Sequence, residues 1–109
     1  MTDTASHDGI GLDKQTQAKI RGVFSNFLAV EEAILYGSRA MGTYRPGSDI
    51  DLTLKGCSLS WRDLQQVEVA LDDLLLPYRF DLSLYDQIDN PDLLAHIGRV
   101  GIVFYSREG

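Results

Sequence analysis

The chain has 109 residues, of which 44% are hydrophobic and 24% are charged. This length and this balance predict one globular domain and exclude wholesale disorder, collagen-like sequence and coiled coil. Ten basic residues against 16 acidic residues give a net charge of −6. The charge argues against duplex nucleic acid as the main partner, because phosphate binding needs a basic surface.

No apolar stretch approaches the roughly 20 residues that a membrane-spanning helix needs. Residues 1–12 are polar and lack the basic and apolar segments of a secretory signal. We therefore expect a flexible leader over 1–12 and the folded domain over 13–109. The single cysteine, Cys57, excludes an internal disulfide and favours a reducing, cytoplasmic location.

Hydrophobic periodicity and turn residues predict the elements of the first half of the chain. Asp13 is placed to cap the first helix. In chain order we expect a helix over 14–28, a buried strand over 33–36, a turn at Gly37-Ser38, a loop over 42–48 and an alternating strand over 49–55.

The second half continues the alternation of helices and strands. Ser60 and Asp63 form a capping-box pattern, and Asn90-Pro91 is a second helix start. We expect a helix over 60–76 that Pro77 ends, a strand over 79–85, a short helix from 90 to 100 and an edge strand over 102–105. This order predicts an α/β fold in which helices cover one mixed sheet.

The most informative segment contains Gly37-Ser38, ten intervening residues, and then Asp49-Ile50-Asp51. Two aspartates at i and i+2 on a strand project from the same face, about 6.5 to 7 Å apart. That spacing suits shared coordination of hard divalent cations. Asp81, on the polar face of the next predicted strand, supplies a third carboxylate. We therefore predict Asp49, Asp51 and Asp81 as catalytic residues and metal ligands.

Gly37 and Ser38 stand between a strand and a helical turn. Their backbone N–H groups and the Ser38 hydroxyl are suited to hold a terminal phosphate. Arg39, Arg45 and Ser48 are further candidates for nucleotide binding, with the two arginines ranked below Gly37 and Ser38 because long basic side chains usually face water.

Together these residues resemble the minimal nucleotidyltransferases of the DNA polymerase β superfamily, whose hallmark is Gly-Ser, a spacer, Asp-x-Asp and a later acid. The resemblance is close over residues 33–54. It implies a small nucleotidyltransferase domain that uses Mg²⁺, two ions in the active complex, or Mn²⁺. It also implies transfer of a nucleoside monophosphate from an NTP, ATP being the first choice, to a hydroxyl.

The same resemblance suggests a partner. Such small proteins are similar to the antitoxin halves of two-gene modules whose toxin is a helical HEPN-type protein. By that resemblance the acceptor is a tyrosine of the toxin. The sequence leaves the oligomeric state open, a homo-oligomer included.

Two alternatives remain open. Family members often have a basic residue where this sequence has Met41, which favours an antitoxin that is catalytically weak and acts by stoichiometric binding. The other alternative is a small-molecule nucleotidyltransferase of the antibiotic-modifying type, for which 109 residues leave little room. We expect His96 to be structural and Cys57 not to be a nucleophile.

Overall fold

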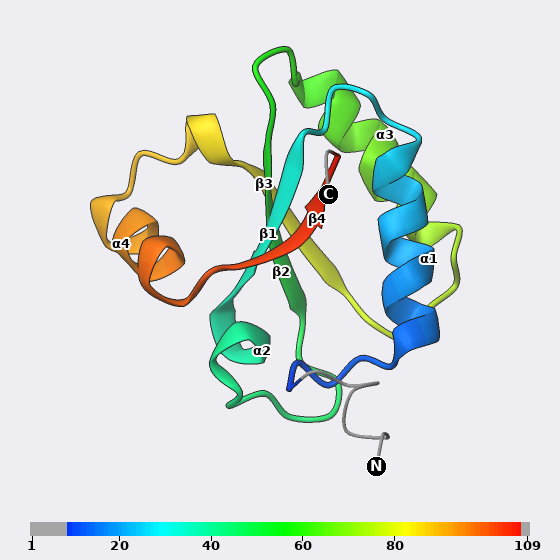
Figure 1. Ribbon diagram of the computed structural model, residues 1–109, viewed down its shortest axis with the longest axis vertical. Coiled ribbons are helices and arrows are strands. Elements are labelled where there is room, and N and C mark those ends of the chain that lie inside the picture. Colours follow the sequence, from blue (N-terminus) through cyan, green and yellow to red (C-terminus); the bar gives the residue numbers. More distant parts are fainter. Residues whose placement is uncertain (1–8, 108–109) are drawn as a thin grey trace.

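The computed structural model describes residues 9–107 (Figure 1). In chain order its elements are α1 (Lys14–Ser25), β1 (Glu32–Tyr36), α2 (Gly37–Met41), β2 (Ile50–Lys55), α3 (Trp61–Asp72), β3 (Phe80–Leu84), the 3-10 helix η2 (Tyr85–Gln87), α4 (Pro91–Val100) and β4 (Ile102–Ser106). The α/β prediction is confirmed, with the short helices α2 and η2 added to the expected order.

The four strands form one sheet in the order β3-β2-β1-β4. β1 pairs antiparallel with β2 and with β4, while β2 and β3 are parallel. A parallel pair needs a crossover connection, and α3 supplies it between β2 and β3. The sheet is therefore mixed, as predicted.

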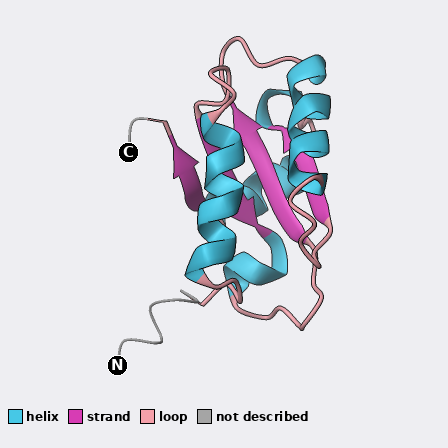
Figure 2. Ribbon diagram, turned by 90° about the vertical axis from the view of Figure 1, so that its right-hand side faces the viewer, coloured by secondary structure: helices cyan, strands magenta, loops and turns pink. Residues whose placement is uncertain are grey.

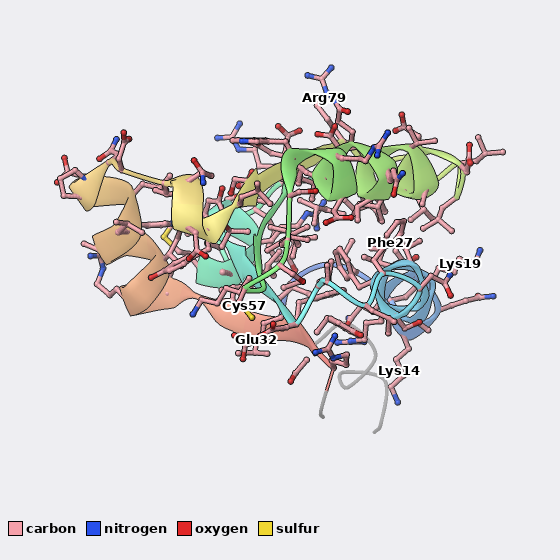
Figure 3. All side chains as sticks on the ribbon, turned by 90° about the horizontal axis from the view of Figure 1, so that it is seen from above. Lys14, Lys19, Phe27, Glu32, Cys57 and Arg79 are labelled. Carbon is pink, nitrogen blue, oxygen red and sulfur yellow. The ribbon has the colours of Figure 1, made fainter. Side chains whose placement is uncertain are left out.

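Helices lie on both faces of the sheet, so the domain has three layers (Figures 1 and 2). Helices α1 and α3 cover one face and enclose the main core. Figure 3 shows the two helices side by side, with Lys14 and Lys19 pointing outward from α1. The fully buried core side chains include Ile20, Phe24, Leu35, Leu52, Leu54, Val67 and Leu71.

The opposite face is only partly covered, by α4. Ile97 of α4 packs against Ile34 and Tyr36 of β1 in a second, smaller apolar cluster. The polar side chains of β2 and β3 lie on this face beside α4, and the candidate site lies there.

The predicted helix starts are confirmed. The Asp13 carboxylate accepts a hydrogen bond from the Thr16 N–H, Ser60 and Asp63 form a complete capping box, and Asn90 caps α4 with Pro91 as the first helical residue. Each cap satisfies backbone donors that have no partner inside the helix.

The predicted helix ends were wrong by three or four residues. Helix α1 ends at Ser25 instead of 28, and α3 ends at Asp72 instead of 76. The apolar spacing in the sequence continues past each helix end. Leu28 and Leu75 are in fact 78% and 87% exposed, and Leu75 has a φ of 57°, which is incompatible with a continuing helix.

Residues 1–12 were expected to form a flexible leader, and residues 1–8 of this segment lie outside the described residues. Within its described part, Ile10 and Leu12 are buried in the main core, 5% and 0% exposed. The packed structure therefore begins before Asp13. Across residues 9–107 there is no helix with the length and apolar character needed to cross a bilayer.

Candidate active site

The candidate site is built around the β1-α2-β2 connection. Strand β1 ends at Tyr36, and the chain turns at once into the five-residue helix α2, whose first residues are Gly37 and Ser38. It then returns through a loop into β2 with Asp49 directly before the strand and Asp51 within it. The predicted phosphate turn and the predicted metal ligands thus lie at the same end of the sheet.

Strand pairing brings two of the three predicted acids together. In the sheet register Asp51 is the direct partner of Asp81 on β3 and of Tyr36 on β1. Neighbouring strands are about 4.8 Å apart, so the three side chains form one row on the face that α4 partly covers. Asp51 is half-buried, whereas Asp49 and Asp81 are exposed.

The electrostatics of Asp51 reflect this arrangement. Burial raises the pKa of Asp51 to about 6, and the carboxylates of Asp81 and Asp49 contribute to the rise. Charge repulsion among close carboxylates disfavours the ionised form. The three acids therefore form a negative centre that a cation would stabilise.

Two observations favour glycine at position 37. Its φ of +77° is in the left-handed region that favours glycine. A Cβ atom there would overlap the carboxylate of Asp51. The backbone of the phosphate turn consequently lies in contact with the central acid.

Ser38 has a hydroxyl that makes no hydrogen bond within residues 9–107, and the side chain is partly exposed. Its backbone carbonyl accepts the N–H of Thr43, which closes the end of α2. The hydroxyl is therefore available to a ligand at the turn.

The donor set suits Mg²⁺ or Mn²⁺, because carboxylate oxygens are the ligands that hard cations prefer. The structural sign of the fit is the register of the sheet, which sets the carboxylates of Asp51 and Asp81 side by side on neighbouring strands. Among residues 9–107, however, no three His, Cys, Asp or Glu side chains are already gathered around one point. Asp49 and Asp81 are exposed, so both carboxylates are accessible to an ion.

Arg39 does not lie where a nucleotide ligand would be expected. It is 2% exposed, and its guanidinium donates two hydrogen bonds to the Ser48 carbonyl, at 3.1 and 2.9 Å, and one to the Ile10 carbonyl, at 2.8 Å. Its Cζ lies 5.3 and 5.1 Å from the ring centres of Tyr44 and Tyr78. The guanidinium N–H groups of Arg39 are bonded to the carbonyls of Ser48 and Ile10. Arg39 therefore holds the loop that leads to Asp49 in place.

Ser48 and Arg45 close the same loop. The Ser48 hydroxyl accepts the Arg45 backbone N–H at 2.8 Å, and the Ser48 N–H donates to the Arg45 carbonyl at 2.9 Å. The Arg45 side chain is exposed and, with Tyr44 and Tyr78, lines a cavity of about 410 Å³ that none of the three acids lines. Ser48 is thus engaged in the loop, whereas the Arg45 side chain is exposed.

Sequence reasoning missed His96. Its ring nitrogen Nε2 accepts the backbone N–H of Gly37 at 3.2 Å, and its ring lies edge-on to Tyr36 with ring centres 6.1 Å apart. His96 is 59 residues from Gly37 along the chain. No local pattern could reveal this contact, because it depends on how α4 packs against β1.

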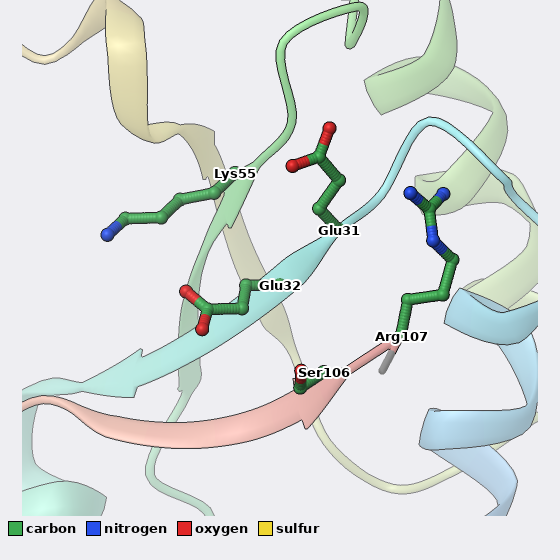
Figure 4. Close-up of a pocket in the computed structure, with 5 residues that line it drawn as sticks. All are labelled: Glu31, Glu32, Lys55, Ser106 and Arg107. Carbon is green, nitrogen blue, oxygen red and sulfur yellow. The ribbon is translucent and has the colours of Figure 1, made fainter. Parts of the chain in front are cut away.

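Two other cavities lie away from the acids. One, of about 290 Å³, is lined by Glu31, Glu32, Lys55, Ser106 and Arg107 (Figure 4). It is at the opposite end of the sheet, where Glu32 pairs with Lys55 and with Ser106. The other, of about 190 Å³, includes Cys57. The Cys57 N–H and thiol both donate to the Glu31 carboxylate at 3.2 Å, so the cysteine is remote from the candidate site.

A family model described as polymerase beta, nucleotidyltransferase, matches residues 18–109 of this chain. The comparison with curated proteins found no significant match.

Several solved structures share the fold. A toxin-antitoxin complex with AMP-PNP contains a chain 21% identical to this one, with a TM-score of 0.67 over 83% of this chain and 73% of that one. The MNT antitoxin complex with the tri-AMPylated HEPN toxin of Shewanella oneidensis gives 16% identity and a TM-score of 0.63 over 87% and 73%. A putative nucleotidyltransferase from Sulfolobus solfataricus gives 20% identity and a TM-score of 0.53 over 87% and 80%. At these identities the likeness shows the fold alone.

Proposed function

Because this chain belongs to the polymerase beta nucleotidyltransferase family, we propose that it transfers AMP from ATP to a protein hydroxyl with the help of Mg²⁺. The observation that carries the proposal is the row in which Asp51 pairs with Asp81 beside the glycine turn of Gly37. The carboxylate pair thus lies beside the Gly37-Ser38 turn proposed to bind phosphate. Phosphoryl transfer needs these two features side by side.

Asp49, Asp51 and Asp81 would hold the metal. When bound, two divalent ions supply charge stabilisation for the attacking and leaving oxygens of an in-line displacement. Asp51 would be the central ligand, because it is the half-buried member of the set and lies beside Asp81. Mn²⁺ would serve in the same place, since it also prefers carboxylate ligands.

Ser38 would hold the triphosphate through its hydroxyl, Gly37 would permit its close approach while the Gly37 N–H stays on His96, and Arg45 would be an exposed cation nearby. Arg39 and Ser48 contribute by fixing the loop before Asp49. In the reaction the acceptor oxygen forms a bond to the α-phosphorus of ATP. The bond from that phosphorus to the oxygen bridging to the β-phosphate breaks, and pyrophosphate leaves. Asp81, on the acceptor side, takes the proton of the attacking hydroxyl.

The acceptor we propose is a tyrosine of a HEPN-type toxin, which would make this chain the antitoxin. The support is the fold shared with MNT antitoxins in complexes with HEPN toxins, one of which is AMPylated. Two observations favour a second candidate, neutralisation by binding alone. The three acids are not gathered around one point in the described residues, and Met41 stands where family members often carry a basic residue.

The substitution Asp81→Asn separates the two candidates. It keeps the size of the side chain and removes the charge that the metal and the attacking hydroxyl need. A transferase should keep ATP binding and lose transfer by about a hundredfold or more, as is typical when an acid-base group is removed. The measurement pairs transfer of label from ATP to the purified partner with rescue of growth when the partner is co-expressed.

Asp89→Asn, at an exposed position between η2 and α4, is the matched control and should transfer as the wild type does. If Asp81→Asn fails to transfer but rescues growth as well as the wild type at equal expression, binding alone replaces catalysis as the function.

A further inference from the structure

Helix α4 reaches the phosphate turn through one polar contact. The Nε2 atom of His96 accepts the Gly37 N–H at 3.2 Å. Within residues 9–107 this is the one side-chain hydrogen bond that joins α4 to another element. The neighbouring contacts of α4 with β1 are apolar and involve Ile97 against Ile34 and Tyr36. The Nε2 atom of His96 is therefore the polar link between α4 and Gly37.

The target is Gly37, the residue that joins the phosphate turn to the central acid of the site. Gly37 has a left-handed backbone and lies in contact with the Asp51 carboxylate. Glycine has more backbone freedom than any other residue, so Gly37 needs an external contact to hold one conformation. Its N–H is at the first position of α2, where no intrahelical acceptor exists.

We propose that His96 is a positioning residue that holds the Gly37 backbone, and with it Ser38, at a fixed place beside Asp51. The inference rests on the proposed function, in which the Gly37-Ser38 turn binds the triphosphate. The ring also lies edge-on to Tyr36, with an angle of 82° between the planes. The hydrogen bond from the Gly37 N–H requires the proton of the neutral imidazole to be on Nδ1.

Three variants test the role. His96→Phe keeps the ring beside Tyr36 but has no acceptor, whereas His96→Gln has no ring but carries an amide oxygen that reaches about as far as Nε2. Ala95→Gln places the same amide at the exposed neighbouring position of α4 and is the control. The two readouts are hydrogen exchange of the Gly37 amide without ligand and the affinity for a non-hydrolysable ATP analogue with Mg²⁺.

We expect His96→Phe to weaken binding of the analogue by about threefold to tenfold, the effect of losing one hydrogen bond. Exchange of the Gly37 amide should accelerate by a similar factor. His96→Gln should restore both to within about threefold of the wild type, and Ala95→Gln should change neither. A role in packing alone would give the opposite order, with Phe better than Gln.

The inference is overturned if Gly37 exchange is unchanged in His96→Phe, or if His96→Gln is as impaired as His96→Phe. Should His96→Phe fail to fold, nitrogen NMR of the wild type decides, because a proton on Nε2 in place of Nδ1 would exclude the hydrogen bond. If the wild type does not bind the analogue, the proposed function fails. The exchange measurement and the tautomer still decide the role of His96.

Discussion

Replacing Asp51 by asparagine should stabilise the metal-free protein. Burial and the carboxylates of Asp81 and Asp49 raise the pKa of Asp51 from 3.8 to about 6, so the ionised side chain destabilises the fold at pH 7. The full difference corresponds to about 3 kcal/mol. Because Asp51 is partly exposed and solvent screens its charge, we expect Asp51→Asn to gain about 1 to 2 kcal/mol at pH 7 to 8.

The pH dependence follows from the direction of the shift. Since folding raises the pKa, the folded protein binds the proton of Asp51 more tightly than the unfolded chain does. The destabilisation is complete above pH 6 and is lost as the pH falls toward 4. The advantage of Asp51→Asn should therefore shrink over that range and nearly vanish at pH 4.

The assay is urea unfolding followed by circular dichroism, first with EDTA and then with Mg²⁺. Mg²⁺ should stabilise the wild type by mass action and leave the stability of Asp51→Asn unchanged. The difference in free energy of unfolding between the two proteins should therefore shrink or change sign. Asp89→Asn serves as the control for removal of an exposed charge. The reasoning is refuted if Asp51→Asn is less stable than the wild type in EDTA at pH 7, or if it responds to Mg²⁺ as the wild type does.

Two further variants test the phosphate turn and the loop. Ser38→Ala should weaken nucleotide affinity by about 1 to 3 kcal/mol, the range for a hydrogen bond to a charged group. The free energy of unfolding of Ser38→Ala should hardly change. Calorimetric titration measures the nucleotide affinity and urea unfolding measures the stability. An unchanged affinity would contradict the proposed role of Ser38. Arg39→Met should lower the free energy of unfolding by about 2 to 4 kcal/mol, because it leaves the Ser48 and Ile10 carbonyls without their donor. Arg62→Met, at an exposed position, is the control. Equal losses of unfolding free energy in the two variants would refute the structural role of Arg39.

The sequence predicted the parts of the site that depend on local spacing. Gly37 and Asp51 lie at the ends of one connection between paired strands, so a motif read along the chain brings them together. The caps at Asp13 and Ser60 were predictable for the same reason, since each bonds within three residues. Asp81 was placed correctly on the next strand, whereas its pairing with Asp51 depends on the parallel register of β2 and β3, which the sequence did not predict.

What the sequence could not predict depends on packing between distant segments. Arg39 was ranked as a surface cation, yet it is buried because the Ser48 and Ile10 carbonyls and two tyrosine rings surround it. Ile10 had been assigned to a flexible leader, although it packs into the main core. His96 had been considered structural, because nothing in its neighbourhood along the chain indicates the contact with Gly37.

The arrangement of the site has a consequence for the order in which it is assembled during folding. Gly37, Ser38 and Asp51 belong to a hairpin of neighbouring strands, whereas Asp81 and His96 come from β3 and α4. Contacts between nearby residues close small loops and form readily, while distant contacts cost more loop entropy. The turn and its central acid therefore form with the hairpin, and the third acid and the histidine join only when β3 and α4 dock. A partly unfolded form that has lost β3 and α4 would keep the hairpin but not a complete site, so activity should disappear before the hairpin unfolds.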